Sequence, residues 1–533
     1  MIVGPTSISP PAIVARVLRA LVLGAIVLAA FAIRYPAVTF GLPALVHPDE
    51  YAVVDPSRQM AETGNPDPGT FVYPSLFYYV QAVSYRLRYA LSDAPTFADV
   101  PLTTIYITGR TVTVLFSVAT VLVAYLCAVE IYGGGAALIA AALTAFSRLH
   151  VANSLPITTD VPMTFFVTLS LWMSVRICTR GGRMRDYAAA AFAAGLAAST
   201  KYNGGLAILP VLVAHVVCFS RSRAVPAGRH AAGATWPASL ADGRLALAAV
   251  AGVLGFVVAT PYSVLHPDLF VAFLDALHDR YVTIDSGAVS QGTSYGFYFG
   301  ALSDGFGALP LAAAAVGLAL LAIRKPRVAA ILAVFPIAWF AVMGAYPVHF
   351  DRNIVAVVPF AAIAAGCSIM VLADAAAHTP RGRWRVSMWV ATACTAALLA
   401  VGGNRQLAAA REYTRVLVLP NTQWLSKTWI DENLPRGSLI AREHYTPAVD
   451  AQRFHVFEVG FWGLISSADV EGCDYLVASS GDFGRFVNHP DQFPEEAAAY
   501  HSLFASYDLI KTFRGDGLTA TGPEIRVYRR RAS

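Results

Sequence analysis

Two adjacent carboxylates are the residues of this chain whose types and spacing most directly suggest chemistry. Asp49 and Glu50 follow His47 and Pro48, just after the first long apolar segment. A carboxylate at a membrane surface can take the proton of a reacting hydroxyl group. The pair therefore predicts a catalytic acid or base. The simpler alternatives are that both are solvated loop acids, or that one caps a helix.

Four more charged residues stand at the ends of apolar runs. Asp160 begins one run, Lys201 lies in a short turn between two runs, and Arg110 and Arg352 flank others. Charges at such positions usually face a cavity or one another, because exposure to lipid costs a few kcal/mol each. We expect Asp160 to be a third catalytic acid, and the three cations to bind the phosphate of an amphiphile. Alternatively, Asp160 caps a helix, Lys201 snorkels and Arg352 only sets interfacial position.

The elements that must position these residues are membrane helices. Hydrophobic residues make up 56% of the 533 residues and charged residues 14%, which is too apolar for a soluble chain. Eleven long apolar runs predict about eleven transmembrane helices: 20–33, 112–129, 136–146, 161–175, 187–198, 206–219, 245–258, 308–323, 328–343, 354–372 and 386–401. Five of the six cysteines lie in these runs or, for Cys178, in the flank of one, and Cys473 has no partner outside, so no disulfide framework is expected. The net charge of +5 lies mostly in loops and does not indicate nucleic-acid binding.

Basic residues set the predicted orientation. Four loops are rich in arginine or lysine: Arg180, Arg183 and Arg185; Arg221, Arg223, Arg229 and Arg244; Arg324, Lys325 and Arg327; and Arg381, Arg383 and Arg385. Eleven spans put all four loops on one side, which the positive-inside rule makes cytoplasmic. The amino terminus is then cytoplasmic, and the acidic pair, Asp160 and the carboxyl-terminal region face outward.

The first outer loop, residues 34–103, contains one segment that could change this count. Residues 73–91 are helical in pattern but carry six aromatic residues and two arginines, which favours an amphipathic helix lying in the membrane interface. As a span, this segment would invert every later loop. A second alternative makes the first span a cleaved signal segment, but a catalytic loop so close to it favours a retained anchor.

The composition changes near residue 402, which divides the chain into a transmembrane module, 1–401, and an outer domain, 402–533. Asn421 is expected to cap a helix over 422–433, and 495–505 predicts a second helix. Five β-rich runs alternate with them: 438–443, 454–459, 475–479, 509–513 and 525–528. This alternation predicts a small extracytoplasmic α/β domain.

Several ordered motifs carry a resemblance to a known family. HPDEY at 47–51, YPSLFYY at 73–79, TTDVP at 158–162, STKYNGG at 199–205 and HFDRN at 349–353 resemble the polytopic GT-C glycosyltransferases. The closer likeness is to the family 39 group of protein O-mannosyltransferases and lipid A aminoarabinose transferases. It covers roughly residues 12–375, and the carboxyl-terminal domain is similar only to the variable outer domains of bacterial members.

The resemblance implies transfer of a sugar from a polyprenyl-phosphate carrier to a glycan, lipid or protein acceptor at the outer face of the cytoplasmic membrane. It implies catalytic roles for Asp49, Glu50 and Asp160, and carrier-phosphate binding by Lys201, Arg352 and Arg110. His47, Tyr73, Tyr202 and His349 are further candidate substrate contacts. The sequence has no glycine-rich phosphate-binding loop of the kind that a nucleotide-sugar donor would need, and no histidine spacing matches a zinc motif. No cofactor is therefore expected to be required, with a divalent metal as the less favoured alternative.

Two other classes of function remain open at this stage. A transporter or flippase of a lipid-linked substrate also has charged outer cavities, but it should show inverted repeats and broken helices. A non-catalytic envelope assembly protein would use the outer domain to bind a partner. An in-line displacement at the anomeric carbon, with inversion, is the expected mechanism of the transferase.

Overall fold

The computed structural model describes residues 10–219, 242–282, 293–380, 382–459, 463–466 and 468–531. The chain forms two compact units, the first made of Met1–Val38 with Asp49–Arg411 and the second of Thr39–Pro48 with Glu412–Ser533. Arg221, Arg223, Arg229 and Arg381, which the orientation argument uses, lie outside the described residues.

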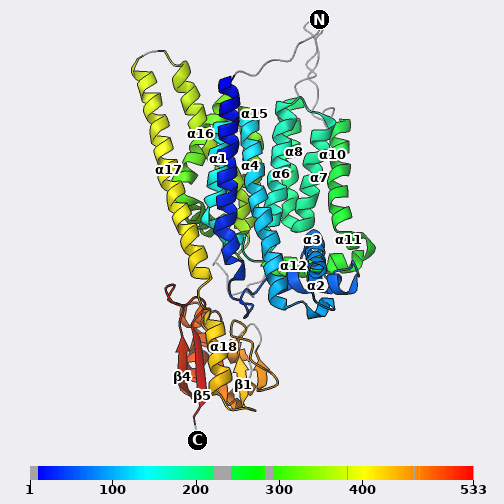
Figure 1. Cartoon of the computed structure of the whole chain (residues 1–533), viewed down its shortest axis with the longest axis vertical. Coiled ribbons are helices and arrows are strands. Elements are labelled where there is room, and N and C mark those ends of the chain that lie inside the picture. The colour runs from blue at the N-terminus through cyan, green and yellow to red at the C-terminus, as the bar shows by residue number, and fades with distance from the viewer. Residues whose placement is uncertain are drawn as a thin grey trace. The chain divides into compact units, whose positions relative to one another are not determined.

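The first unit is helical (Figure 1). The helices that contain most or all of each predicted apolar run are α1 (Pro10–Arg34), α4 (Leu102–Phe146), α6 (Asp160–Thr179), α7 (Met184–Thr200), α8 (Leu209–Phe219), α10 (Gly243–Ala259), α14 (Ala308–Arg324), α15 (Pro326–Ala345), α16 (Val358–His378) and α17 (Arg383–Leu417). The other described α-helices of this unit are α2 (Tyr51–Thr63), α3 (Leu76–Ala90), α5 (Arg148–Asn153), α11 (Tyr262–Leu265), α12 (Pro267–Val282) and α13 (Tyr295–Leu302). The helical turns η3 (Tyr202–Ile208) and η5 (Asp351–Val357) precede α8 and α16.

All eleven apolar runs lie in helical segments, and α4 contains two of them. The helix is interrupted between those two, where Tyr132 and Gly133 leave helical geometry and Gly133 has φ 80°, a value that suits glycine. Among the described residues, seven helices are long and apolar enough to cross a membrane, and two shorter helices are apolar. The protein is a multi-pass membrane protein, and the predicted fold class is confirmed. The number of crossings stays a prediction.

Small residues allow the membrane helices to approach closely. A Cβ atom added at Gly317 of α14 would overlap the carbonyl oxygen of Ala364 in α16, and one added at Gly366 would overlap that of Ala136 in α4. Membrane helices pack through such contacts because lipid is as apolar as the side chains, so burial alone gives little drive for association. These two glycines hold α16 between α4 and α14.

The predicted first outer loop contains two longer helices where the sequence predicted one. A helix is present in the expected segment as α3, which begins at Leu76 with Ser75 at the N-cap position, and its interfacial placement stays a prediction. The helix α2, directly after the acidic pair, was missed because Pro56 lies inside it and proline normally interrupts a helix. In Figure 1, α2 and α3 gather with α11 and α12 at one end of the helical unit.

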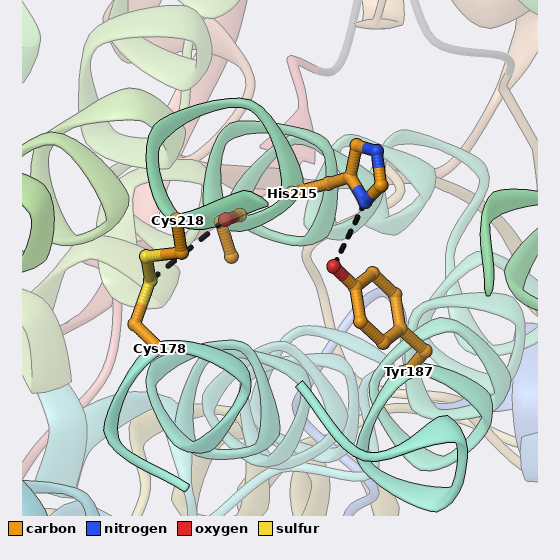
Figure 2. Close-up of a disulfide and its surroundings, with 5 residues drawn as sticks. Cys178, Tyr187, His215 and Cys218 are labelled. Carbon is orange, nitrogen blue, oxygen red and sulfur yellow. Dashed lines mark hydrogen bonds between the residues drawn. A yellow bond between two sulfur atoms is a disulfide. The ribbon is translucent and has the colours of Figure 1, made fainter. Parts of the chain in front are cut away.

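One cysteine prediction was wrong. Cys178 at the end of α6 and Cys218 at the end of α8 form a disulfide, with their Cα atoms 5.6 Å apart, within the normal range for such a bond. Figure 2 shows it beside the hydrogen bond between the Tyr187 hydroxyl and His215 Nδ1, 2.8 Å long. Nothing in the sequence pairs cysteines of different helices, whereas the packing of α6 against α8 brings Cys178 and Cys218 together.

The second unit contains a five-stranded mixed sheet. Its strands are β1 (Leu439–Arg442), β2 (His455–Glu458), β3 (Tyr475–Ser479), β4 (Tyr507–Phe513) and β5 (Ile525–Arg530), in the order β2-β1-β3-β5-β4. β1 pairs in parallel with β2 and β3, while β5 runs antiparallel to β3 and β4. The five predicted strands are therefore confirmed.

The two helices predicted for the second unit are present as α18 (Thr422–Asn433) and α20 (Pro494–Ala505), and a short helix, α19 (Phe483–Val487), lies between β3 and α20 in the chain. The Asn421 side chain accepts a hydrogen bond of 2.8 Å from the Gln423 amide, which is the expected N-cap. The boundary between the compact units, at Arg411 and Glu412, lies inside α17. The division at residue 402 therefore falls within a continuous helix, and the proposed domain roles stay predictions.

The sheet encloses an acid that the sequence analysis did not single out. Glu443 follows β1 and is fully buried, accepting hydrogen bonds from the Tyr500 hydroxyl at 2.6 Å and the Ser479 amide at 2.6 Å. Burial, with the nearby Asp482 carboxylate, raises the pKa of Glu443 to about 8. These contacts fasten the end of β1 to β3 and α20.

Candidate active site

The three predicted acids and the three predicted cations form three ion pairs in the helical unit. Asp49 pairs with Arg352 at 2.8 Å, Glu50 with Arg110 at 2.7 Å, and Asp160 with Lys201 at 2.7 Å. The partners come from distant parts of the chain, so each pair joins separate elements. The structure thus brings every predicted charged residue into contact with another, in pairs and not around one shared centre.

The Glu50–Arg110 pair is fully enclosed, since both side chains have 0% exposure. Arg110 in α4 donates to both Glu50 oxygens, from Nε at 2.8 Å and Nη2 at 2.7 Å, and donates from Nη1 to the Val38 carbonyl at 2.9 Å. The Ile157 amide also donates to Glu50 Oε1 at 2.9 Å. The two-pronged geometry is the strongest form of this contact. It fastens the start of α2 to α4 and to the segment before α6.

Tyr85 of α3 borders the same pair. It is fully buried, and burial followed by the Glu50 charge raises its pKa well above the usual value. Its hydroxyl therefore stays neutral beside the enclosed pair. Such a setting suits a structural ion pair better than a group that exchanges protons with a substrate.

The Asp49–Arg352 pair is more accessible. The Asp49 side chain is 29% exposed and that of Arg352 is 22% exposed. Arg352 lies in η5, just before α16, and its guanidinium carbon is 4.2 Å from the centre of the Phe350 ring. Of the three pairs, this one can best be reached by a ligand.

Asp160 and Lys201 form the third pair, which Asn353 extends. Asp160 is the first residue of α6, and the extended backbone of Lys201 separates α7 from η3. Lys201 Nζ donates to Asp160 Oδ1 at 2.7 Å and to Asn353 Oδ1 at 3.3 Å. Asn353 directly follows Arg352 in η5, so Lys201 contacts the sequence neighbour of the first pair's cation. A phosphate site shared by Lys201 and Arg352 stays a prediction, and Arg110 lies in the enclosed pair with Glu50.

Asn353 is a site residue that the sequence reasoning missed. Its side chain is 2% exposed, its Nδ2 donates to the Tyr298 hydroxyl at 3.0 Å, and its carbonyl accepts from Trp339 Nε1 at 2.7 Å. Its position next to Arg352 could have drawn attention to it, but nothing in the sequence shows that it faces Lys201. Burial and three hydrogen bonds make it the residue that orients the Lys201 ammonium.

Arg34, at the end of α1, was also missed. It is fully buried and donates to the Ala30 carbonyl, to Ser154 Oγ at 3.0 Å and to His150 Nδ1 at 3.2 Å. An arginine inside an apolar segment is a recognised functional signal and could have been noted. Its contacts hold the start of the first outer loop against α5.

The four further candidate substrate contacts, Tyr202, Tyr73, His349 and His47, make hydrogen bonds or ring contacts with other residues of the chain. The Tyr202 hydroxyl donates to the Phe71 carbonyl at 2.8 Å, and the Tyr73 amide donates to the Tyr78 hydroxyl at 3.3 Å. His349 Nδ1 is 3.2 Å from Ser294 Oγ, and its ring centre is 4.0 Å from that of Phe297.

His47 belongs to the second unit, where its ring lies edge-on to Phe40 at 6.5 Å. Substrate contact by any of these four residues stays a prediction. Among the described residues, no cluster of three or more His, Cys, Asp and Glu side chains is arranged to hold a metal ion.

Comparison with known proteins gives one family match in sequence and several matches in structure. The sequence model of the dolichyl-phosphate-mannose-protein mannosyltransferase family matches residues 107–235, a stretch that includes Arg110, Asp160 and Lys201. No protein of curated function matches the chain in sequence.

Solved structures match over nearly the whole chain. ArnT from Cupriavidus metallidurans, bound to undecaprenyl phosphate, has 17% sequence identity and a TM-score of 0.55, with 96% of this chain and 98% of that one covered. The oligosaccharyltransferase AglB from Archaeoglobus fulgidus, in complex with an inhibitory peptide and a dolichol-phosphate, has 15% identity and a TM-score of 0.59, covering 94% and 74%.

The same archaeal enzyme tethered to an acceptor peptide has 15% identity and a TM-score of 0.58, with 97% and 74% covered. The protein therefore has the fold of the GT-C membrane glycosyltransferases, as the sequence motifs indicated. Identities this low define the fold, and the activity is argued below from the site.

Proposed function

We propose that this protein is a glycosyltransferase that moves a sugar from a polyprenyl-phosphate carrier to an acceptor hydroxyl at the outer face of the cytoplasmic membrane. One observation carries the proposal: Lys201, which pairs with Asp160, also contacts Asn353, and Asn353 directly follows Arg352, which pairs with Asp49. Two cations suit a lipid phosphate, and two acids suit a reacting hydroxyl. The solved relatives that hold undecaprenyl phosphate or dolichol-phosphate support this assignment.

The ion pairs suggest how donor binding prepares the site. A phosphate that enters it competes with Asp49 for Arg352 and with Asp160 for Lys201. Each cation that turns to the phosphate loosens its hold on a carboxylate, and a carboxylate without its cation is a stronger base. In this proposal, carrier binding frees the carboxylate that acts as the base.

In the transfer step, Asp49 takes the proton of the acceptor hydroxyl. The acceptor oxygen forms a bond to the anomeric carbon while the bond from that carbon to the phosphate oxygen breaks, and the phosphate leaves with the electron pair. Lys201 and Arg352 stabilise the charge that develops on the phosphate. Attack opposite the leaving group inverts the anomeric configuration. Asp160 assists from beside Lys201.

In this proposal, Glu50 and Arg110 do not contact the substrate but hold the neighbouring backbone in place. The sequence analysis proposed Glu50 as a catalytic acid and Arg110 as a phosphate ligand, but their complete burial and two-pronged contact favour a structural role. They hold the start of α2, and with it Asp49. No metal or other cofactor takes part in the proposed reaction.

Replacing either proposed phosphate ligand should weaken carrier binding. Lys201→Met and Arg352→Gln each remove a charge-assisted contact, and the expected loss of about 1.5–3 kcal/mol corresponds to roughly 10- to 150-fold weaker binding of sugar-free undecaprenyl phosphate. Binding to purified protein in detergent measures this directly. Arg324→Gln breaks an exposed ion pair with Asp374 and serves as the matched control. Equal carrier affinity in all three variants would remove these cations from the phosphate site.

The orientation can be tested by labelling. Asn65→Cys is exposed after α2, and Arg183→Cys is exposed between α6 and α7. The positive-inside rule puts Asn65 outside and Arg183 in the cytoplasm, so an impermeant thiol reagent should label only Asn65→Cys in intact cells. Permeabilised cells should show both. Labelling of Arg183→Cys alone in intact cells would reverse the proposed topology.

We assign transfer to the transmembrane module, residues 1–401, and contact with the glycan, lipid or protein acceptor to the outer α/β domain, residues 402–533. The parallel part of its sheet, formed by β2, β1 and β3, offers this domain a surface for such a contact. The partners are then a lipid-linked sugar, membrane lipids and the acceptor.

A further inference from the structure

Three buried polar atoms around the Asp160–Lys201 pair have no hydrogen-bond partner within the described part of the chain. They are the hydroxyl oxygens of Thr158 and Thr159 and the side-chain carbonyl oxygen of Asn203. Thr158 is 3% exposed and Thr159 is 1% exposed. A buried polar atom without a partner loses its bonds to water and gains nothing in return. Three such atoms, each within two residues of Asp160 or Lys201, point to a ligand at this pair.

Other buried threonines of the helical unit show how readily this hydroxyl is satisfied. Thr113, Thr144, Thr164 and Thr168 each donate to the carbonyl oxygen four residues earlier, at distances of 2.7 to 3.3 Å. Thr158 and Thr159 precede α6, so neither has a preceding helical turn of α6 to bond. Their position deprives them of the usual partner.

The three atoms belong to the two segments that the ion pair joins. Thr158 and Thr159 immediately precede Asp160, and Asn203 follows Lys201 by two residues. Asp160 Oδ1 and Lys201 Nζ are 2.7 Å apart, and the Ile157 amide is held by Glu50. A ligand bound here would lie beside the proposed phosphate ligand Lys201.

The chemistry of these atoms selects the ligand. A hydroxyl group both donates and accepts, and an amide oxygen accepts only. An acceptor beside Lys201 would repel a phosphate, and an apolar lipid tail would leave all three atoms unsatisfied. A sugar presents hydroxyl groups that donate and accept. We propose that Thr158, Thr159 and Asn203 bind hydroxyl groups of the sugar on the donor and thereby select which sugar is transferred, an inference that rests on the proposed function.

Valine in place of threonine removes the hydroxyl and keeps the shape. Thr158→Val and Thr159→Val should bind undecaprenyl phosphate carrying a sugar at least about 10-fold more weakly, and should bind sugar-free undecaprenyl phosphate as the wild type does. The free protein should melt at the same or a higher temperature, because an unsatisfied hydroxyl has been removed. Thr164→Val, which loses a hydroxyl already bonded to the Asp160 carbonyl, is the matched control and should leave both affinities unchanged.

The probes are undecaprenyl phosphate alone and the same lipid carrying a hexose, an N-acetylhexosamine or a pentose, used with the sugar that the wild type binds best. Thr158→Ser and Thr159→Ser should restore affinity, since serine keeps the hydroxyl. Equal affinity of the valine variants for both probes would overturn the sugar site and leave an enclosed water as the partner. If the wild type distinguishes no sugar-bearing lipid from the bare carrier and transfers none, the proposed function fails together with this inference.

Discussion

Asp49→Asn should lower turnover by 10²- to 10⁴-fold, the range typical of losing a general base. Asparagine keeps the size of the side chain, and its Oδ1 can still accept a hydrogen bond from Arg352, which is 2.8 Å from Asp49 in the native site. Binding of the donor should therefore change little while the proton transfer is lost. Single-turnover transfer from a polyprenyl-phosphate sugar, with donor affinity measured on the same preparation, separates the two effects.

Asp351→Asn provides the control, since Asp351 is an exposed acid one residue before Arg352 with no assigned role in the reaction. It should keep nearly full activity. A fully active Asp49→Asn protein, or a product that retains the anomeric configuration, would contradict the assignment of Asp49 and the in-line mechanism. Asp49→Asn also separates the classes of function, because a non-catalytic assembly protein would keep its binding when this carboxylate is neutralised.

Arg110→Met should destabilise the protein by about 3–5 kcal/mol, the usual cost of leaving a buried charge without its partner. The Glu50 carboxylate would remain fully enclosed. Of the hydrogen bonds described at this carboxylate, only the one from the Ile157 amide to Oε1 would remain. The expected result is a large fall in melting temperature in detergent and loss of transfer, because α2 and Asp49 lose their anchor.

Adding Glu50→Gln to Arg110→Met removes the unpaired charge and should recover much of the lost stability. Activity should stay low, since the neutral pair cannot restore the two-pronged contact. Arg180→Met is the control, because it breaks an ion pair with Glu130 in which the arginine is 43% exposed, and such pairs contribute only about 0–1 kcal/mol. An Arg110→Met protein as stable as this control would show that the buried pair does not hold the loop.

The two predictions draw on different properties of the same short segment. Asp49 and Glu50 are neighbours in sequence, yet one is 29% exposed and the other fully buried. Successive residues at the start of a helix point in different directions. One carboxylate of the pair is therefore accessible to a ligand, and the other is enclosed with Arg110. A reactive group and an anchor are the roles that we propose for them.

The sequence by itself determined the long apolar helices, the five strands and six of the charged residues that form buried or partly buried ion pairs, although it did not reveal α2 or Arg34. Apolar runs predict membrane helices because the bilayer requires about twenty residues of one kind in succession, and Asn421, the five strands and α20 follow from equally local patterns. The six charged residues stood out because charged side chains within or at the ends of membrane helices are rare and usually face a cavity or one another.

Only the tertiary structure decided which charge meets which. Asp49 and Arg352 are 303 positions apart, and nothing local in either segment specifies the other. The choice depends on which helices pack together, through contacts such as Gly317 on Ala364. The same packing paired two cysteines and buried Glu50 with Arg110. It also left the Thr158 and Thr159 hydroxyls without a hydrogen-bond partner among the residues that the structure describes, because partner choice and burial depend on how the helices assemble.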